Sequence, residues 1–496
     1  MSRNSACDLL RSNLDRHPGK AACLFENVVV DYAGLWADSC RFGNLLRQHG
    51  VKRGERVLIV LPDTPAFPFA FFGSLLIGAC PVPVNTSLTV AEYSFLLEDS
   101  GAVVRICPSG HAVLAAEAPG LRVTLLCDAF GPPGLSGMAP ALEPCMVGDD
   151  DVALILYSSG STGQPKGVPH RPAALSAGAG LWGGPVLGLS DTDVVLSSSK
   201  LFFSYGLIAN LLLPMGVGAT TILHPGRPTP HDLFALIARH RPTVFFGVPT
   251  TYGQMIQSYD ATARIDSLRL FFSCGEALPE IIYSEWRALT GIELLDGIGS
   301  TEVLNSPISN RPRRSLAGSC GEVVPGYDIR IVDDDGADVS DGAVGHLLVR
   351  GDSVCRGYWN RQDATAKTML ADGWLRTGDV VERRDGRYFH HGRSDDMMKI
   401  GGMWVPPNRV EETLRGHRAV VDCAVVARSS GGLDRIYAFV ILRTDSVGTS
   451  ALGQELRRHV LGRLPNYMCP LKIEFVTELP RTTTGKVQRF KLRGGQ

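Results

Sequence analysis

Short apolar runs alternate with amphipathic stretches through the first 290 residues. The apolar runs have the length of buried strands and are rich in β-branched and aromatic side chains. Between them, hydrophobic residues recur with the spacing of one helix face. Strands are expected at 56–61, 103–107, 123–127, 220–223, 243–246 and 268–272, and helices at 33–49, 91–100, 231–240 and 280–290. This alternation predicts an α/β fold with parallel sheets and crossover helices.

The pattern changes near residue 318, where short strands are separated by glycines. Segments 327–332, 346–350 and 387–391 predict a small barrel-like sheet. After Gly392 the pattern restarts, with helices expected at 407–415 and 451–464 and strands at 423–428, 436–442 and 471–476. We therefore expect an N-terminal domain over 1–394, with two α/β-layered sheets and the barrel-like sheet. A small α+β C-terminal domain is expected over 395–496.

Charge and cysteine content exclude several classes of protein. Lys and Arg number 49 against 50 Asp and Glu, which leaves a formal charge of −1 and no basic surface for nucleic acid. The 12 cysteines form no C-x-x-C pair, so a zinc ribbon, an iron–sulfur cluster and a redox dithiol are not expected. Reduced thiols and an N-terminus without an apolar signal core predict a cytoplasmic protein.

Two uncharged stretches have the length of membrane spans. Residues 64–91 and 201–223 both contain prolines and polar side chains. We expect each to form a buried helix that leads into a strand, and we expect no membrane partner.

The strongest chemical signal is a Gly/Ser/Thr loop at 157–168, directly after the apolar run 152–156. Its glycines let the backbone approach an anion, its hydroxyls are donors and Lys166 supplies a positive charge. A Walker A motif is excluded because Gln164-Pro165 precedes the lysine and a glycine follows it. Taken alone, the loop indicates either a phosphate site or a polar turn.

Three other turns present charged side chains. Glu302 ends the turn 296–302, and a carboxylate beside a polyphosphate is a hard ligand for Mg²⁺. Asp379 follows a glycine turn and is suited to the paired hydroxyls of a ribose. Lys486 ends a Gly/Thr turn and is a candidate phosphate clamp. Each has an ordinary alternative, namely a solvated acid, a cap or an exposed tail lysine.

Together these segments resemble the successive signatures of the adenylate-forming superfamily: acyl- and aryl-CoA ligases, peptide-synthetase adenylation domains and firefly luciferase. The likeness extends over about residues 20–490. Segments 200–207 and 295–302 resemble the benzoate-CoA ligase branch most closely. The five motifs that carry the resemblance lie, in order, at 158–167, 300–302, 377–379, 392–396 and 484–486.

The resemblance implies which residues bind ATP. The loop would hold the β- and γ-phosphates, Thr301 would contact the α-phosphate, and Glu302 would hold Mg²⁺. Asp379 and Arg393 would bind the ribose. The loop residues are Ser158, Ser159, Gly160, Ser161, Thr162 and Lys166, and those of the adenine slot are Gly275, Glu276, Ala277, Asp296, Gly297 and Ile298.

The resemblance also divides the reaction between two orientations of a mobile C-terminal domain. Lys486 would bridge the carboxylate nucleophile and the α-phosphate during adenylation. Asp395 would be the hinge that then brings a second segment to coenzyme A. This division is physically reasonable, because adenylation needs charge neutralisation whereas thiol attack needs space. The second segment contains Lys399, Gly401, Gly402 and Trp404.

The presumed acyl pocket departs from the benzoate pattern. Ser204 and Asn305 stand where such relatives often have Ala and His, and Ile298 replaces an aromatic ring against adenine. Because buried polar groups need partners, we expect a benzoate with an amino or hydroxyl substituent, such as anthranilate or a hydroxybenzoate. No Asp or Glu occurs between Val194 and His231, which disfavours an amino-acid substrate. The pocket residues are Phe203, Ser204, Tyr205, Gly206, Gly299 and Asn305.

Three motifs resemble functional signatures but lack their context. Residues 178–183 fit G-x-G-x-x-G without following a strand. Residues 197–200 fit S-x-x-K without the companions of a penicillin site. His224, His390 and His391 lack partners at metal-ligand spacing and are expected at strand ends or turns.

We therefore predict an ATP-dependent aryl-CoA ligase that uses Mg²⁺ and coenzyme A and forms an acyl-AMP. The chain ends shortly after Lys486 without a carrier domain, which favours CoA as the thiol acceptor. Two alternatives stay open: a stand-alone adenylation enzyme that loads a carrier protein, and a nucleotide-binding protein without catalysis. Nothing in the sequence indicates an oligomeric state.

Overall fold

The structure is a computed structural model, and it describes residues 5–158, 164–260, 263–400, 403–430, 433–444, 446–481 and 487–493. The chain divides into two compact units. The first unit contains Met1–Arg330, Leu348–Thr377 and Gly386–Tyr388. The second contains Ile331–Leu347, Gly378–Asp385 and Phe389–Gln496. The hinge boundary expected at 394/395 stays a prediction.

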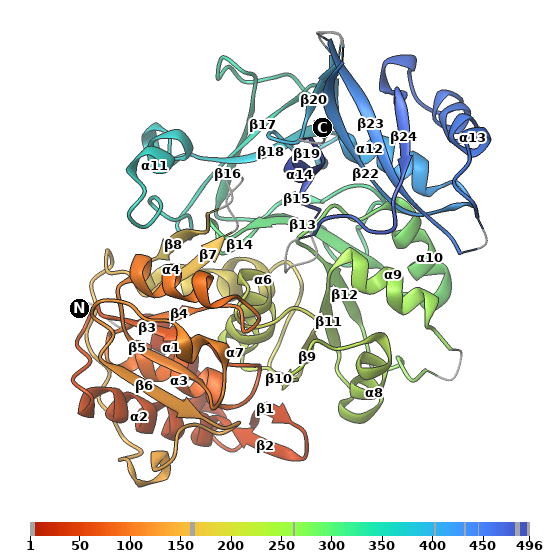
Figure 1. Cartoon of the computed structure of the whole chain (residues 1–496). Coiled ribbons are helices and arrows are strands. Elements are labelled where there is room, and N and C mark those ends of the chain that lie inside the picture. The colour runs from red at the N-terminus through yellow and green to blue at the C-terminus, as the bar shows by residue number, and fades with distance from the viewer. Residues whose placement is uncertain are drawn as a thin grey trace. The chain divides into compact units, whose positions relative to one another are not determined.

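The first unit is built around a nine-stranded sheet (Figure 1). Its inner strands, from β13 to β1, are parallel, and β2, β14 and β15 add antiparallel edges. The strand order is β15 (Glu322–Val323), β14 (Asn305–Ser309), β13 (Leu294–Ser300), β12 (Leu270–Ser273), β11 (Val244–Gly247), β9 (Val194–Ser197), β10 (Thr220–Leu223), β1 (Ala21–Phe25) and β2 (Val28–Asp31).

Three helices cover one face of this sheet: α8 (Pro230–His240), α9 (Pro249–Gln257) and α10 (Glu280–Thr290). Trp286 of α10 is fully buried, with its ring centre 4.9 Å from that of Phe271 and 5.0 Å from that of Tyr252. Burial of each large ring removes apolar surface from water, which is the main favourable term in folding. The sheet is therefore held rigidly beneath the loops at the carboxyl ends of its strands.

A second, fully parallel sheet of four strands has the order β4 (Cys80–Pro83), β3 (Arg56–Ile59), β5 (Ala102–Pro108) and β6 (Val123–Cys127). Helices α1 (Ser5–Arg16), α2 (Tyr32–Gln48), α3 (Ala66–Leu76) and α4 (Val90–Ser100) accompany it. Helix α4 begins at a capping box, in which Thr89 accepts from the backbone of Glu92 and the Glu92 carboxylate accepts from the backbone of Thr89. It ends at Gly101, whose φ of +60° suits glycine.

The two uncharged stretches form buried helices that lead into strands, as predicted. Residues 64–91 contain α3 followed by β4. Residues 201–223 contain α6 (Ser204–Leu207), a π-helix at Ile208–Leu212, α7 (Leu213–Val217) and then β10. Among the helices that the structure describes, none combines the length and apolar character needed to cross a bilayer.

A second π-helix, at Gly178–Gly183, follows the short helix α5 (Pro172–Ala177). The G-x-G-x-x-G sequence therefore lies in a helical segment and does not follow a strand, as the sequence indicated.

The segments predicted after residue 318 are strands, and both compact units take residues from them. They are β16 (Tyr327–Val332), β17 (Val344–Gly351), β18 (Leu375–Arg384) and β19 (Arg387–Arg393), with α11 (Gln362–Thr368) between β17 and β18.

The rest of the second unit has the predicted α+β composition. A hydrophobic core that includes Val410, Val425 and Leu456 joins its helices to its main sheet. The elements are β20 (Met398–Ile400), β21 (Met403–Val405), α12 (Pro407–Arg415), β22 (Val420–Ser430), β23 (Leu433–Leu442), α13 (Ser450–Leu461), β24 (Lys472–Phe475) and α14 (Arg489–Arg493).

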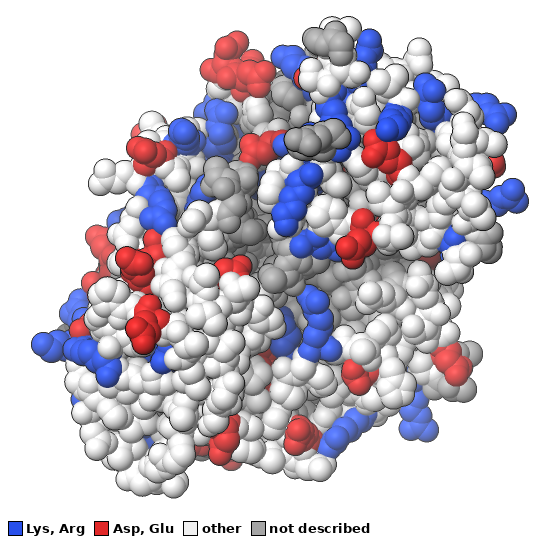
Figure 2. Space-filling view, in the orientation of Figure 1, with Lys and Arg blue, Asp and Glu red and all other residues white. Residues whose placement is uncertain are grey.

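No disulfide bond joins the 12 cysteines, all of which the structure describes, and all except Cys145 and Cys469 are buried. On the face shown in Figure 2, acidic and basic side chains are interspersed.

Candidate functional site

Two antiparallel strands carry the ends of the phosphate loop. Strand β7 (Leu154–Ser158) pairs with β8 (Lys166–His170), and Ser158 lies opposite Lys166. Lys166 therefore begins a strand, whereas a Walker A lysine leads into a helix. The four loop residues expected to surround phosphate lie outside the described residues, and their roles stay predictions. They are Ser159, Gly160, Ser161 and Thr162.

The candidate phosphate lysine and the candidate metal ligand both contact Tyr358. The Tyr358 hydroxyl donates to Glu302 Oε1 at 2.8 Å, and Lys166 Nζ lies 5.1 Å from the centre of the tyrosine ring. Burial and the Glu302 carboxylate raise the pKa of Tyr358, so its hydroxyl stays protonated and remains a donor. Residues from two separate motifs are therefore brought together by a side chain that belongs to neither.

Thr301 and Glu302 occupy the tight turn between β13 and β14. Ser300 and Asn305 pair across this turn, and Leu304 closes it with a φ of +51°. The Ser204 and Thr301 hydroxyl oxygens lie 3.1 Å apart, so the start of α6 is hydrogen-bonded to the turn. This contact places a candidate acyl-pocket residue directly beside the candidate α-phosphate ligand.

The residues expected to form the adenine slot lie at the carboxyl ends of β12 and β13, where open α/β sheets bind ligands. Asp296 is 5% exposed, and burial raises its pKa to about 8. The Cys320 thiol donates to its Oδ2 at 3.8 Å, whereas Oδ1 has no hydrogen-bond partner among the described residues. A buried carboxyl oxygen without a partner fits a ligand that carries a donor, such as an amino group.

The other residues of the slot flank Asp296. Gly275 begins the turn after β12 and is exposed, with a φ of +93° that suits glycine. Glu276 and Ala277 are half-buried on this turn, and Gly297 and Ile298 continue β13 in the interior. No aromatic ring takes part at these positions, as the sequence predicted.

Asn305 belongs to a buried polar network in which the Tyr327 hydroxyl is the middle group. Its Nδ2 donates to the Tyr327 hydroxyl at 2.7 Å, and that hydroxyl shares a hydrogen bond of 2.7 Å with Ser353. Asn305 is 2% exposed, and its Oδ1 has no partner within the described part of the chain. A methyl group placed on Gly178 would lie 3.7 Å from this oxygen. Asn305 is therefore fixed at one end and has an unused acceptor at the other.

The remaining acyl-pocket candidates lie at the start of α6. The Tyr205 hydroxyl donates to the carbonyls of Gly247 and Phe272, at 3.2 and 3.1 Å, so this side chain is fixed by two strands. Phe203 precedes it with its ring centre 4.5 Å from that of Phe202.

Two glycines make this region compact. A Cβ atom on Gly206 would lie 2.0 Å from the carbonyl oxygen of Lys200, so only glycine fits there. A Cβ atom on Gly299 would lie 2.9 Å from the carbonyl oxygen of Asn305. The Lys200 ammonium itself pairs at 2.9 Å with the buried carboxylate of Asp63, which agrees with the reading against an S-x-x-K nucleophile site.

In the second unit, Asp379 accepts from two basic side chains. Its Oδ1 lies 3.1 Å from Arg393 Nη1 and 3.2 Å from His390 Nε2. Burial alone would raise the pKa of Asp379, but Arg393 and His390 outweigh it and lower the pKa well below its usual value. A Cβ atom on Gly378 would lie 2.8 Å from the Arg393 guanidinium, so glycine leaves the space for this contact. The two candidate ribose ligands are thus adjacent, and Asp379 is ionised.

The segment expected to serve coenzyme A forms the hairpin of β20 and β21. Lys399 pairs with Trp404 across it and is exposed. Gly401, Gly402 and the Trp404 side chain lie outside the described residues, as does Lys486. Asp395, the expected hinge, is exposed.

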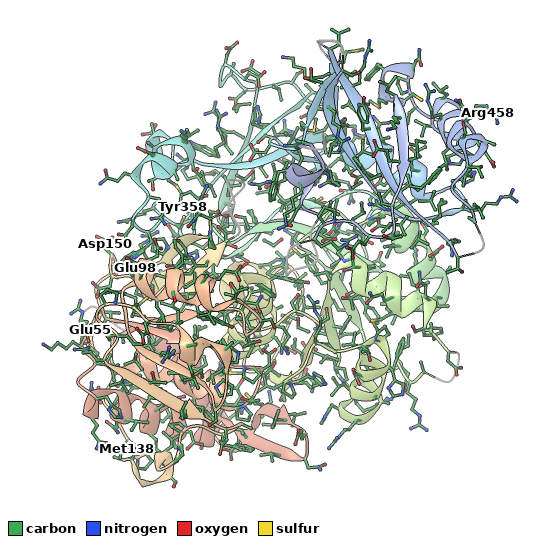
Figure 3. The ribbon with its side chains drawn as sticks, in the orientation of Figure 1. Glu55, Glu98, Met138, Asp150, Tyr358 and Arg458 are labelled. Carbon is green, nitrogen blue, oxygen red and sulfur yellow. The ribbon has the colours of Figure 1, made fainter. Side chains whose placement is uncertain are left out.

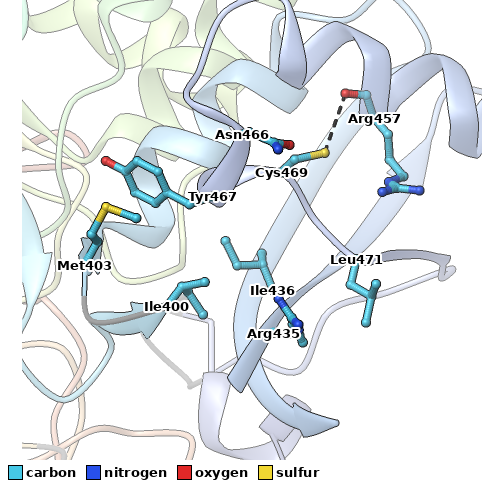
Figure 4. Close-up of a pocket in the computed structure, with 9 residues that line it drawn as sticks. All are labelled: Ile400, Met403, Arg435, Ile436, Arg457, Asn466, Tyr467, Cys469 and Leu471. Carbon is cyan, nitrogen blue, oxygen red and sulfur yellow. Dashed lines mark hydrogen bonds between the residues drawn. The ribbon is translucent and has the colours of Figure 1, made fainter. Parts of the chain in front are cut away.

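A cavity of about 540 Å³ adjoins this hairpin within the second unit (Figure 4). Ile400 and Met403 of the hairpin line it together with Arg435 of β23 and Arg457 of α13. Tyr467 and Cys469 close it, and the Cys469 thiol donates to the carbonyl of Arg457 at 3.8 Å.

Sequence reasoning missed four residues that contact the candidate site. Tyr358 and His390 each touch a candidate ligand, but they belong to no motif that was singled out for binding. Tyr327, which contacts Asn305, and Ser353, which contacts Tyr327, were missed because these hydrogen bonds join residues 22 and 26 positions apart. His390 was considered in the sequence only as a metal ligand. Among the described residues no cluster of metal-binding side chains occurs.

Comparisons with known proteins agree with this geometry. The sequence pattern of the AMP-binding enzyme family matches residues 10–359, and that of the AMP-binding enzyme C-terminal domain matches residues 409–486. The benzoate–CoA ligase of Thauera aromatica is 38% identical, and the alignment covers 99% of this chain and 95% of that protein. The chain belongs to the AMP-binding enzyme family.

Solved structures give the same result. A benzoate CoA ligase from Burkholderia xenovorans LB400 superimposes with a TM-score of 0.91 at 41% identity, over 99% of this chain and 100% of that one. The anthranilate CoA ligase AuaEII in complex with anthranoyl-AMP superimposes with a TM-score of 0.92 at 36% identity, over 98% of this chain and 96% of that one. The predicted fold class is confirmed.

Proposed function

We propose that this chain is an AMP-forming aryl-CoA ligase. It activates an aromatic carboxylic acid with ATP to give an aryl-AMP and pyrophosphate, and then transfers the aryl group to coenzyme A with release of AMP. The carboxylate is a poor electrophile, and conversion of one of its oxygens into part of AMP creates a leaving group that a thiol displaces. The full-length similarity to benzoate and anthranilate CoA ligases supports this reaction class.

The described residues suit the binding of Mg·ATP. Glu302 fits Mg²⁺ because carboxylate oxygens are hard ligands and its Oε2 has no hydrogen-bond partner among the described residues. When bound, Mg²⁺ neutralises charge on the phosphates. Lys166 then binds the β- and γ-phosphates, Thr301 donates to the α-phosphate, and the unpartnered Oδ1 of Asp296 accepts from the adenine amino group.

Two roles belong to the second unit. Asp379, kept ionised by Arg393 and His390, accepts hydrogen bonds from the ribose hydroxyls. Lys486 stabilises the negative charge that develops at the α-phosphate during adenylation. Rotation about Asp395 replaces Lys486 with the Lys399 hairpin for thioester formation. A cytoplasmic location fits an enzyme whose substrates are ATP and coenzyme A.

The Asn305 network carries the proposal for the substrate. Ser204 already shares a hydrogen bond with Thr301, so its hydroxyl does not require a substituent on the ring. Asn305 Oδ1 is different, because it is buried and unpartnered while Tyr327 fixes the amide. An unused buried acceptor favours a substrate that brings a donor. The acid is therefore a benzoate with an amino or hydroxyl substituent.

A panel of acids tests this assignment. We compare benzoate, the three aminobenzoates, the three hydroxybenzoates and their methyl isosteres by chromatographic detection of the CoA thioester. At one ring position, kcat/KM for the donor-bearing acid should exceed that for its methyl isostere by roughly tenfold, the value of one hydrogen bond. Asn305→Leu should remove this difference, whereas Asn210→Leu, at a buried amide outside the candidate site, should keep it.

Three outcomes would count against the proposal. Faster turnover of benzoate than of every substituted acid would overturn the substrate assignment alone. Aryl transfer to a carrier protein without transfer to coenzyme A would indicate a stand-alone adenylation enzyme, and failure of ATP–pyrophosphate exchange with every acid would indicate a nucleotide-binding protein without catalysis.

A further inference from the structure

The segment Cys355–Trp359 connects the turn that carries Glu302 to the strand that carries Lys166. The backbone N–H of Cys355 donates to the carbonyl of Glu302 at 2.8 Å. At the other end, the backbone N–H of Trp359 donates to the carbonyl of Gly167 at 2.8 Å. The segment is therefore fixed at one end to the residue expected to bind Mg²⁺ and at the other to the neighbour of the phosphate lysine.

Tyr358, labelled in Figure 3, is oriented by contacts with residues that follow it closely in the chain. Its backbone N–H donates to Thr365 Oγ1 at 2.9 Å, and Thr365 Oγ1 donates in turn to the carbonyl of Arg361 at 2.8 Å. Gly357 adopts a φ of +151°, and a Cβ atom there would lie 2.7 Å from Thr365 Cγ2. Only glycine permits this close approach, so the backbone dictates the direction of the Tyr358 side chain.

The hydroxyl and the ring face of Tyr358 contact side chains of opposite charge. Its hydroxyl donates to Glu302 Oε1 at 2.8 Å, and the face of its ring lies 5.1 Å from the Lys166 ammonium. Both contacts are favourable, because a carboxylate accepts a strong hydrogen bond and a cation is attracted to a ring face. Glu302 and Lys166, which are both described, form no ion pair with each other.

This arrangement matters because a lysine and a glutamate in one phosphate site attract each other. A direct ion pair would occupy the carboxylate that must bind the metal and the ammonium that must bind phosphate. Tyr358 gives each group a neutral partner instead, which leaves Glu302 Oε2 for a divalent ion and the Lys166 ammonium for phosphate. The Tyr358 hydroxyl donates to Oε1 and thereby fixes the plane of the Glu302 carboxylate. The fixed plane sets the direction of Oε2.

We propose that Tyr358 is a positioning residue for the adenylation half-reaction, in which its hydroxyl orients Glu302 for Mg²⁺ and its ring holds Lys166 for the phosphates of ATP. This inference rests on the proposed function, because it assumes that Glu302 and Lys166 bind Mg·ATP. It adds that Tyr358, which lies outside the five signature motifs, keeps Glu302 and Lys166 from pairing with each other and orients both side chains.

Two substitutions separate the two contacts. Tyr358→Phe removes the hydroxyl and keeps the ring, so the affinity for Mn·ATP, measured by electron paramagnetic resonance without any aryl acid, should fall by roughly threefold to tenfold. Binding of metal-free ATP in EDTA, measured by calorimetry, should be unchanged. Tyr358→Leu removes the ring as well, so binding of metal-free ATP should also weaken, by roughly twofold to fivefold.

Control variants distinguish positioning from loss of stability. Tyr93→Phe removes a buried hydroxyl that donates to the Asn85 carbonyl at 2.8 Å, and it should leave both affinities unchanged. In the Glu302→Gln background, Tyr358→Phe should have no further effect on Mn·ATP binding, because the carboxylate that it orients is absent. The KM for the aryl acid should be the same in wild type and Tyr358→Phe.

Each result has a definite meaning. Equal affinity of wild type and Tyr358→Phe for Mn·ATP would overturn the positioning role while leaving the proposed function intact. An additive effect of Tyr358→Phe in the Glu302→Gln background would overturn it too. Failure of the wild type to bind Mn·ATP at all would instead contradict the proposed function.

Discussion

The buried carboxylate of Asp379 accepts from the half-exposed Arg393 guanidinium at 3.1 Å, and His390 binds the same carboxylate oxygen from 3.2 Å. Arg393 and His390 both bind Oδ1 and so fix the plane of the Asp379 carboxylate. The fixed plane sets the direction of the second oxygen, Oδ2. Gly378 leaves the space in which the guanidinium lies. The pair therefore presents an ionised acceptor at the position where the motif order predicts the ribose of ATP.

The first prediction concerns this acceptor. Asp379→Asn keeps the size of the side chain and removes the charge, so we expect ATP to bind roughly tenfold to a hundredfold more weakly, since hydrogen bonds to charged groups are the stronger ones. The KM for the aryl acid should change little. Equilibrium titration with ATP measures the effect, and Glu382→Gln is the matched control, because Glu382 on the same strand pairs with His391 at 3.1 Å. Equal weakening by both variants would contradict a ribose contact.

The second prediction follows from the raised pKa of Asp296. Burial raises its pKa to about 8, so between pH 4 and pH 8 the folded protein holds a proton that the unfolded chain has released. The free energy of unfolding therefore falls as pH rises through this window, with a slope of at most about 1.4 kcal/mol per pH unit from this one group. Urea unfolding of the ligand-free protein should show that Asp296→Asn has a flatter profile. Parallel profiles for the two proteins would contradict a buried, protonated carboxyl.

Regular elements were predictable because their periodicity dominates the local sequence. The strand at 220–223 and the helices at 280–290 and 407–415 have the predicted bounds. In each segment the hydrophobic residues follow a single period, and turn residues flank the segment. The π-helices at Gly178–Gly183 and Ile208–Leu212 were not predictable. Their residues are mostly apolar or small, so no polar face reveals the wider turn.

The candidate site was predictable in its residues and not in its contacts. Glu302 and Lys166 each stand in a motif, but Tyr358 follows Glu302 by 56 positions, and only the fold places its hydroxyl on that carboxylate. Asn305 was singled out because it stands where benzoate-activating relatives often have His, whereas its partner Tyr327 carried no such signal. Local patterns encode which groups are present, and long-range register decides which groups meet.

The third prediction divides the two half-reactions. Lys486→Ala removes the charge expected at the α-phosphate, so ATP–pyrophosphate exchange should fall by roughly a hundredfold or more. Thioester formation from chemically prepared aryl-AMP should stay within a few-fold of wild type, because thiol attack takes place in the other orientation. Rapid-quench measurement of each step gives the two rates. A matching loss in both steps would refute the division of roles.

The last prediction rests on how the chain beyond Lys486 is held. Arg489 donates to both carboxylate oxygens of Glu411, at 2.9 and 3.0 Å, and Glu411 is 2% exposed. Arg489 also lies 3.5 Å from Asp396, and Arg493 pairs with the same aspartate at 2.7 Å. Asp396 directly follows the expected hinge residue, so these contacts connect the start of the C-terminal domain to the segment that carries Lys486.

Arg489 contacts Glu411 through Nη2 and faces Asp396 with Nη1. Arg489→Lys keeps the charge, but one ammonium cannot reproduce both contacts, so the segment after Lys486 loses its fixed position. We expect aryl-AMP formation to slow by roughly tenfold, which corresponds to about 1.4 kcal/mol of lost positioning. Thioester formation from aryl-AMP should be retained, as for Lys486→Ala, and rapid-quench assays compare the two. Arg105→Lys, at a buried arginine of the first unit, is the control for stability and should slow neither step selectively. Equal slowing of both steps by Arg489→Lys would show that the pair only stabilises the domain.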